Sequence, residues 1–384
     1  MANVSSSNGL EKRPKLRFPG FDDPWKETTL SALFSKSTQK NTDGHITNVI
    51  CNSARLGLIP QREYFDKDIA NSDNTSGYYI IRQNDFVYNP RKSSDAPYGP
   101  ISSYKYAEDG IVSPLYLCFH AKGEINPLYY EWYFRSSAWH RYIYMSGDSG
   151  ARHDRVSIKD DTFFAMPINL PSELEQSKIA SFLQSLDERI AAQERLVASL
   201  KKYKRGLLSN AFRNASSWRK KRLGEICCIR TGKLDANAMI NDGKYPFFTC
   251  ARERYSIDTY AFDTDALLIS GNGANVGYIH HYTGKFNAYQ RTYVLDQFQE
   301  DINYVHVFLN RFLSSRIDAE KKAGNTPYIV LSTLSDMEIY IPDETTTKQL
   351  VDLFTQIENR ISYSATVLEY LSAQRRGLLQ QLFI

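Results

Sequence analysis

The most suggestive catalytic pattern in the sequence is a glycine-rich turn. Residues 270–277 read Ser-Gly-Asn-Gly-Ala-Asn-Val-Gly and follow the apolar run 266–270. A strand that leads into such glycines could hold a nucleotide or S-adenosylmethionine. The glycines are spaced GxGxxxG, however, and residues 278–282 have the character of another strand, so the helix N-terminus that would bind phosphate is missing. The pattern favours a tight turn between strands, one that could face a ligand.

Other catalytic and metal-binding patterns are incomplete. Residues 126–129, Asn-Pro-Leu-Tyr, come nearest to the Asn/Asp-Pro-Pro-aromatic motif of adenine methyltransferases but lack its second proline. No Gly-Lys pair is followed by Ser or Thr, as a phosphate-binding loop requires. The histidines lack the spacing of a zinc site, and His280 and His281 fit the two sides of a strand. The sequence therefore predicts a chain without catalytic residues, metal or cofactor.

Several loops instead mix basic, amide and aromatic side chains. Arginine pairs with guanine, and asparagine or glutamine with adenine, through two hydrogen bonds in the major groove. Lysine and arginine elsewhere neutralise phosphates, although any one such residue could be an ordinary surface residue. The candidate DNA-contacting residues in the first half of the chain are Asn89, Arg91, Lys92, Ser93, Tyr104, Lys105 and Arg152. Those in the second half are Lys233, Asn272, Asn275, Tyr289, Gln290 and Arg291.

A run of cations connects the two halves. Residues 201–222 contain nine Lys or Arg and no Asp or Glu. Cations stabilise the C-terminal end of a helix, and charge runs are often simply solvated. Contact with phosphate or with a partner is the alternative, and the sequence leaves both open.

Two long helices are expected to position these residues. In segment 170–213 apolar residues recur at alternating steps of four and three, which indicates a helix that packs on another helix. Pro171 followed by Ser172 and Glu175 predicts its start with a capping box. Segment 341–384 aligns with it without a gap. The residues expected to pack the pair are Ile179, Leu183, Leu186, Ile190, Val197, Leu200, Leu207, Leu350, Phe354, Ile357, Ile361, Leu368, Leu371 and Leu378.

The alignment indicates that the protein is duplicated. Both helices end in Arg-Gly-Leu-Leu, and their polar interruptions coincide, Gln193 with Ser364 and Lys204 with Arg375. Short connections favour antiparallel packing of the two. Each globular region shows strands first and a helix near its end. We therefore expect an α+β fold: two globular domains separated by an antiparallel pair of long helices, with an approximate two-fold repeat.

The expected boundaries follow from this organisation. They are a mobile tail (1–16), a first domain (17–167), a central spacer helix (168–216), a second domain (217–340) and a C-terminal spacer helix (341–384).

Composition restricts the setting of the protein more than its function. There are 47 Lys and Arg against 43 Asp and Glu, so the net charge of +4 does not by itself name a nucleic-acid partner. Five cysteines without CxxC spacing suit a reducing cytoplasm. The first residues lack a signal-peptide core, and no apolar run reaches membrane-spanning length. A soluble, cytoplasmic protein is expected.

The chain resembles the specificity subunit of type I DNA restriction–modification systems. The resemblance rests on the opening 16–25 (LRFPGF…W), on 265–279 (DALLISGNGANVGYI) with 288–295 (AYQRTYVL), and on the helix endings 204–208 (KRGLL) and 375–379 (RRGLL). It covers the chain from about Lys15, and the doubled helix is its most specific part.

The resemblance implies a non-catalytic DNA-recognition subunit. Each globular domain would be a target-recognition domain for one half of a bipartite double-stranded DNA target, and the helices would fix the gap between the halves. Two methyltransferase subunits and motor–nuclease subunits would be partners, with S-adenosylmethionine, ATP and Mg on those partners. A self-contained DNA methyltransferase or nuclease is the alternative, which the missing motifs oppose. A coiled-coil scaffold without a DNA role would leave the two divergent globular regions unexplained.

Overall fold

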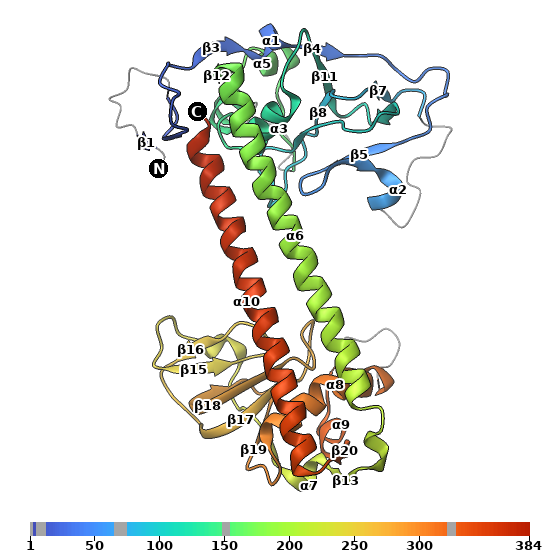
Figure 1. The fold of residues 1–384 in the computed structure, drawn as a ribbon, viewed down its shortest axis with the longest axis vertical. Coiled ribbons are helices and arrows are strands. Elements are labelled where there is room, and N and C mark those ends of the chain that lie inside the picture. The colour runs from blue at the N-terminus through green and yellow to red at the C-terminus, as the bar shows by residue number, and fades with distance from the viewer. Residues whose placement is uncertain (1–2, 5–12, 65–74, 148–153, 321–327) are drawn as a thin grey trace. The chain divides into compact units, whose positions relative to one another are not determined.

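The chain forms two compact units. The computed structural model describes residues 3–4, 13–64, 75–147, 154–320 and 328–384. Unit 1 comprises Met1–Ala192 with Leu368–Ile384, and unit 2 comprises Gln193–Val367. Two helices of 39 residues each, α6 (Glu173–Ala211) and α10 (Glu344–Leu382), are the longest elements (Figure 1). Each unit therefore holds the beginning of one long helix and the end of the other.

Unit 1 is built on a four-stranded antiparallel sheet. Its strands lie in the order β4 (Phe34–Ser37), β11 (Leu117–Ala121), β8 (Phe86–Tyr88), β9 (Ile101–Ser103). Antiparallel strand pairs surround it: β1 (Asn3–Val4) with β2 (Leu16–Arg17), β3 (Lys26–Thr29) with β12 (Pro167–Leu170), β5 (Ile50–Ser53) with β6 (Gly57–Pro60), and β7 (Tyr79–Ile81) with β10 (Gly110–Val112). The shorter helices are α1 (Leu30–Leu33), α2 (Gln61–Tyr64), α3 (Pro127–Arg135), α4 (His140–Ser146) and α5 (Asp160–Phe164).

Unit 2 is built on a six-stranded sheet. Its strands lie in the order β14 (Cys228–Thr231), β19 (Thr292–Asp296), β17 (Phe262–Ser270), β18 (Ile279–Ala288), β15 (Tyr245–Phe248), β16 (Tyr255–Ile257), and only β15 and β18 pair in parallel. The strand β13 (Arg219–Arg222) pairs with β20 (Glu338–Ile341). The helices are α7 (Leu223–Ile226), α8 (Ile302–Glu320) and α9 (Leu331–Ser335), with short 3-10 turns η2 (Ala215–Ser217) and η3 (Ala236–Ala238).

The predicted duplication is present in the structure. In unit 1 the strand pair β3–β12 carries α1, and in unit 2 the pair β13–β20 carries α7. The same backbone bond closes each arrangement: Leu30 N donates to Met166 O, and Leu223 N donates to Met337 O, both at 2.9 Å. The strands-then-helix order of both globular regions is confirmed.

The aromatic segment of each unit folds as a helix with a capped start. The Asn126 side chain accepts from Tyr129 N at 3.1 Å to begin α3, and the Asp301 side chain accepts from Tyr304 N at 3.2 Å to begin α8. An amide or carboxylate oxygen at this position satisfies a backbone donor that the helix leaves unpaired. The two helices are therefore equivalent elements of the repeat.

Each long helix ends against the capped helix of one unit. The Phe383 ring at the end of α10 lies 5.6 Å from the Tyr129 ring. The aligned Phe212, just after α6, lies 6.4 Å from the Tyr304 ring and 5.8 Å from the Phe308 ring. Contacts between aromatic rings at such distances add to the free energy of burying the rings. The apolar core of each unit thus includes the end of a long helix.

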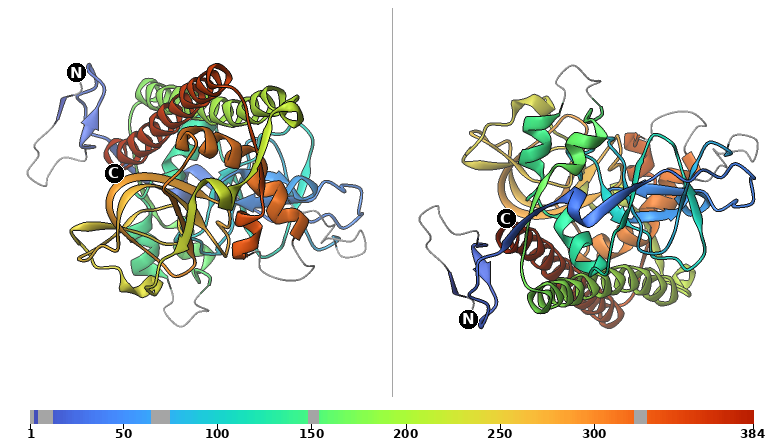
Figure 2. Two further views of the ribbon diagram at one scale, coloured as in Figure 1. Left: turned by 90° about the horizontal axis from the view of Figure 1, so that it is seen from below. Right: turned by 90° about the horizontal axis from the view of Figure 1, so that it is seen from above.

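The residues expected to pack the two long helices together are not exposed. All fourteen residues of this expected packing surface are buried or half-buried, and α6 and α10 lie side by side and antiparallel within each unit (Figure 2). The polar interruptions lie on the same surface. Gln193 Nε2 donates to Ser364 O at 2.8 Å, Lys204 pairs with Glu358, and Arg375 pairs with Asp187.

These polar contacts obey the repeat. Asp187 aligns with Glu358, and Lys204 aligns with Arg375, so the two ion pairs are one contact made twice. Gln193 bonds to Ser364, the residue with which it aligns. The antiparallel α+β fold expected from the sequence is therefore confirmed, with polar contacts that the sequence did not specify.

The predicted capping box is wrong in one half. Ser172 Oγ accepts from Glu175 N at 3.4 Å, but the Glu175 carboxylate does not return to the backbone. It is fully buried and accepts from Arg17 Nε and Nη2 at 2.7 and 2.8 Å. A bidentate arginine satisfies a buried carboxylate better than one backbone N–H. The helix begins at Glu173, directly after the predicted cap Ser172, and residues 167–170 before it pair as a strand with β3.

The tail expected at residues 1–16 falls mostly outside the described residues. Asn3–Val4 pairs antiparallel with Leu16–Arg17. Across the described part of the chain, no helix is both long and apolar enough to span a membrane.

Reversing one helix–helix ion pair tests the packing. Lys204→Glu places two carboxylates together across the helix pair, and Glu358→Lys places two ammonium groups together. Each single variant should lower the urea midpoint, and the double variant should recover it with a coupling free energy of about 1 kcal/mol. The same reversal of the exposed pair Lys348–Glu344 on α10 is the control and should show almost no coupling. Equal coupling in both cycles would contradict a structural role for Lys204.

Candidate nucleic-acid interface

A cleft of about 700 Å³ in unit 1 gathers most of the first set of candidates. The Asn89 side chain fixes one side of this cleft. The Asn89 amide donates to Asn52 O at 3.2 Å, and the Asn89 side-chain oxygen accepts from Arg91 N at 3.1 Å. Gly99 has φ +83° and approaches so closely that a Cβ would lie 2.1 Å from Asn89 O. The candidates that line this cleft are Asn89, Arg91, Lys92 and Ser93.

The same cleft contains an arginine that the sequence analysis missed. Arg91 forms a β-bridge with Arg155, and Lys92 N donates to Asp154 O at 2.9 Å. Arg155 lines the cleft, and its buried Nε lacks an acceptor among the described residues. A long-range backbone pairing brings it there, so no local sequence signal could have identified it. The candidate Arg152 lies outside the described residues.

Tyr104 requires a correction. It was expected on a surface loop, but its side chain is fully buried and its hydroxyl donates to Glu108 O at 2.8 Å. Burial raises its pKa to about 12. Aromatic side chains are buried for their large apolar area, and a tyrosine hydroxyl then needs a local partner. Tyr104 belongs to the core of unit 1.

Lys105 stands apart from the cleft. Its ammonium lies 3.0 Å from the Glu131 carboxylate, which is buried and also pairs with Arg135 at 2.7 Å. Ser103 Oγ donates to the same carboxylate at 2.8 Å. A buried carboxylate is stable only with such partners, so the position of Lys105 is explained by Glu131.

The glycine-rich segment of unit 2 is a tight turn between β17 and β18, as the sequence favoured. Gly277 N donates to Ser270 O at 2.8 Å, and Ser270 N donates to Tyr278 O at 2.9 Å. Gly273 and Gly277 have φ of +79° and +80°, a region that glycine enters without steric cost. The segment continues into a strand, so it offers none of the phosphate-binding geometry of a helix N-terminus.

This turn meets two other loops of unit 2. Asn275 Nδ2 donates to Cys250 O at 3.1 Å, and Cys250 Sγ donates to Arg291 O at 3.4 Å. Gly271 N donates to the same Arg291 oxygen at 2.8 Å. Three loops that are distant in sequence are therefore fixed around Arg291.

A fourth loop joins through the candidate Gln290. Gln290 N donates to Leu234 O at 2.9 Å, and its side-chain amide donates to the Asp235 carboxylate at 2.7 Å. Gly232 permits this approach, because a Cβ there would lie 1.9 Å from Ala288 O. Lys233 follows on the same loop and is exposed. We call residues 232–235, 249–254, 270–278 and 289–292 the unit-2 loop cluster.

The candidates in this cluster have different surroundings. Lys233, Gln290 and Arg291 are exposed, whereas Asn272, Asn275 and Tyr289 are half-buried. Asn272 pairs as a β-bridge with Tyr328. Their shared loops bring all six candidates of unit 2 into one region.

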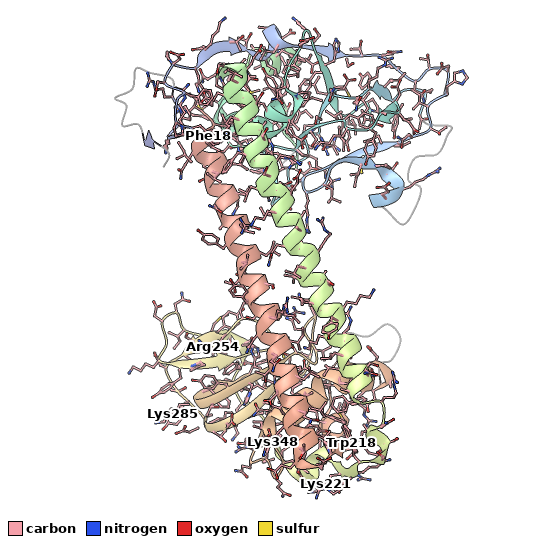
Figure 3. All side chains as sticks on the ribbon, in the orientation of Figure 1. Phe18, Trp218, Lys221, Arg254, Lys285 and Lys348 are labelled. Atoms are coloured by element: carbon pink, nitrogen blue, oxygen red, sulfur yellow. The ribbon has the colours of Figure 1, made fainter. Side chains whose placement is uncertain are left out.

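Two further arginines of the cluster were missed. Arg252 Nε donates to Asn275 Oδ1 at 3.3 Å, and its guanidinium lies 5.4 Å from the Tyr278 ring centre. Arg254, labelled in Figure 3, is exposed on the same loop. The sequence of loop 249–254 has no pattern that indicates DNA contact. Only the hydrogen bonds between this loop and Asn275 of the glycine turn show that Arg252 and Arg254 belong to the cluster.

Burial disfavours a positive charge on His280, the histidine nearest the loop cluster. His280 and His281 follow each other on β18, as predicted. His280 Nε2 lies 3.1 Å from Ala251 O, and burial lowers the pKa of the ring. Across the described ranges, no group of three or more His, Cys, Asp or Glu side chains could hold a metal ion.

Three cations in the second half of the cation run pair with acids. Arg219 and Lys221 both lie 2.9 Å from the Glu300 carboxylate, and Lys220 lies 3.6 Å from that of Glu338; Lys221 is labelled in Figure 3. The ion pairs within the chain account for these three cations without a phosphate or a partner. In the first half of the run, Lys201, Lys204 and Arg205 on α6 line a cleft.

Comparison with known proteins connects unit 2 to a family. Residues 215–372 match the family model of the Type I restriction modification DNA specificity domain. Over 166 residues the chain is 37% identical to the Type I restriction enzyme EcoDI specificity subunit of Escherichia coli. This alignment covers 42% of the chain and only 37% of the length of that relative.

Solved structures extend the likeness in fold. The S subunit of a Type-I restriction-modification system from M. genitalium has a TM-score of 0.62 at 16% identity and covers 97% of this chain and 99% of its own. A chain from a study of complex assembly and conformational transition of the type I R-M system has a TM-score of 0.59 at 18% identity, covering 94% and 98%. At these identities the likeness concerns the fold alone.

The close approach at Gly232 gives a testable prediction. Gly232→Ala places a methyl group against Ala288 O, so the loop 232–235 must separate from 289–292 at a cost of about 1–3 kcal/mol. Hydrogen exchange of the Gln290 amide should become faster and the urea midpoint should fall. Gly206→Ala is the control, because open space surrounds that helical glycine and alanine should stabilise α6. Unchanged exchange at Gln290 in Gly232→Ala would refute the close approach.

Proposed function

We propose, from the match of residues 215–372 to the type I restriction–modification specificity domain and from the repeated fold, that the chain is the subunit that reads a bipartite double-stranded DNA target. On this proposal it carries no reaction itself. It directs partner methyltransferase and nuclease subunits to the target.

One observation carries the proposal most strongly. The same structural frame is present twice in one chain, including the aligned ion pairs Asp187–Arg375 and Lys204–Glu358, while the polar loops that the two halves carry differ. Two equivalent frames with different polar loops suit two readers of different sequences. A single active site would not call for such a repeat.

The reading surfaces follow from the loop geometry. We assign the first half-site to domain 17–167 and the second to domain 217–340, with 168–216 and 341–384 as the spacer helices. Arginine, asparagine and glutamine carry the hydrogen-bonding groups that distinguish bases in the major groove. The proposed contacts in unit 1 are Asn89, Arg91, Lys92, Ser93 and Arg155, with Arg152 retained as a candidate. Those in unit 2 are Lys233, Arg252, Asn272, Asn275, Tyr289, Gln290 and Arg291.

The proposed partners supply the chemistry. Two methyltransferase subunits would hold S-adenosylmethionine, and motor–nuclease subunits would hold ATP and Mg. The five free cysteines suit assembly in the reducing cytoplasm. A neighbouring gene for a methyltransferase with an Asn-Pro-Pro-aromatic motif would provide the partner for reconstitution.

Methylome sequencing of cells that express this chain with that methyltransferase tests the proposal. The expected result is one bipartite motif with methylated adenines. Arg291→Ala should relax or weaken recognition in one half of the motif only, and Arg91→Ala in the other half only. Each lost bidentate contact to a base is worth about 1–3 kcal/mol of discrimination.

Two outcomes would refute the proposal. One is methylation by this chain without the partner, which would make it an enzyme in its own right. The other is a motif that changes in both halves when either arginine is replaced.

A further inference from the structure

We propose that a basic cleft in unit 2, where α8 meets α6 and α10, holds the phosphodiester backbone of the duplex that the unit-2 loop cluster reads. This inference rests on the proposed function and adds a second, sequence-independent contact to it. The cleft has a volume of about 1030 Å³.

Cations from three elements line the cleft. Lys201, Lys204 and Arg205 come from α6, Arg311 from α8, and Arg252 from the loop cluster. Among the described residues that line it, Glu358 is the single acid, and it pairs with Lys204. The excess positive charge therefore calls for an anion.

Arg311 provides the most specific indication. Its Nε is buried and has no acceptor within the described part of the chain, and its Nη2 reaches only Ser209 Oγ at 3.5 Å. The guanidinium lies 4.8 Å from the Phe312 ring centre, which fixes its plane. A buried donor without an acceptor destabilises the protein, because the group has lost its hydrogen bonds to water. A phosphate oxygen would supply the acceptor.

Neutral donors complete the lining. Asn303, Asn310, Ser314 and Ser315 all lie on α8 and face the cleft. Burial, with the neighbouring His281 and Lys204, lowers the pKa of His306 to about 4. His306 is therefore neutral at pH 7, and the charge of the cleft comes from lysine and arginine.

The equivalent junction in unit 1 is balanced. There Asp187 pairs with Arg375 and lies 3.7 Å from Arg135, and Arg135 pairs with Glu131 at 2.7 Å. Glu131 and Arg135 occupy the positions that His306 and Asn310 occupy in unit 2, counted from the caps Asn126 and Asp301.

The comparison separates structure from function. Since unit 1 joins its helices with paired charges, the unpaired charge of unit 2 is no requirement of the fold. Unit 2 has His306 where unit 1 has the acid Glu131, and Arg311 where unit 1 has Ser136. These two differences make the unit-2 junction a candidate anion site.

The cleft is continuous with the loop cluster, which identifies the anion. Arg252 and Tyr278 line the cleft, and Arg252 bonds to Asn275 in the loop cluster. A duplex whose bases meet the loops would present its backbone to this cleft. Phosphate contacts of this kind position a protein on DNA without reading sequence.

The test compares two aligned positions. Arg205 and Arg376 both begin an Arg-Gly-Leu-Leu ending and are both exposed, but only Arg205 lines the cleft. Lys201 aligns with Ser372, so Lys201→Ser installs the residue of the other repeat. The variant is Lys201→Ser with Arg205→Ala, and the control is Ser372→Ala with Arg376→Ala. Both double variants retain all fourteen residues of the packing surface between α6 and α10.

The measurement is the affinity of the reconstituted complex with methyltransferase for its DNA target across a series of salt concentrations. Each lost phosphate contact should reduce the slope of log K against log salt by about 0.9, so the variant should lose about 1.8 and bind more weakly at low salt. Its methylated motif should not change. The control should keep the wild-type slope.

An unchanged slope in the variant would overturn the proposal. So would loss of methyltransferase from the purified complex, because that would make the cleft a protein-binding site. If the wild-type complex itself binds DNA without sequence preference, the proposed function fails. If the wild-type complex methylates a bipartite motif but the variant keeps the wild-type salt slope, the cleft proposal fails and the proposed function stands.

Discussion

The structure depends on the register of two long helices, and polar contacts between them set that register. An apolar surface of Leu, Ile, Val and Phe stabilises packing but tolerates sliding by a turn or a heptad. Polar residues on such a surface restrict the choice, because a shifted partner would leave them unpaired. Here a carboxylate–cation pair occurs in each unit, and Gln193 bonds to its aligned residue Ser364. The register is thus specified by polar contacts at equivalent positions of the two repeats, so a duplication of one segment creates these contacts at the same time.

This arrangement makes each unit a joint product of both repeats. Phe383, the second-last residue of the chain, packs in the core of unit 1 against α3, and Phe212 does so in unit 2 against α8. The globular part of each repeat therefore folds on the end of a helix from the other. With the frame fixed in this way, loops such as 89–93 and 289–292 can differ without altering what holds them.

The sequence predicted the frame well and the loops poorly. Helix periodicity is local, so fourteen packing positions and the antiparallel pairing followed from spacing and from short connections. The glycine turn at 270–277 was also predictable, because a strand followed by glycines and another strand leaves few alternatives. Tyr104 was misplaced, since its burial depends on residues far along the chain such as Asn48, whose side-chain amide donates to the Tyr104 hydroxyl. Arg155, Arg252 and Arg311 were missed for the same reason: long-range pairing and neighbouring charges, rather than local pattern, define their surroundings.

On the proposed function, the α6–α10 helix pair separates two independent DNA readers. Insertion of one heptad after Gln193 and one after Ser364 lengthens each helix by about 10 Å while preserving the packing surface. Methylome sequencing should then show two unchanged half-sites with a gap longer by about three base pairs, since duplex DNA rises about 3.4 Å per base pair. A motif with the original gap, or with altered half-sites, would contradict the account.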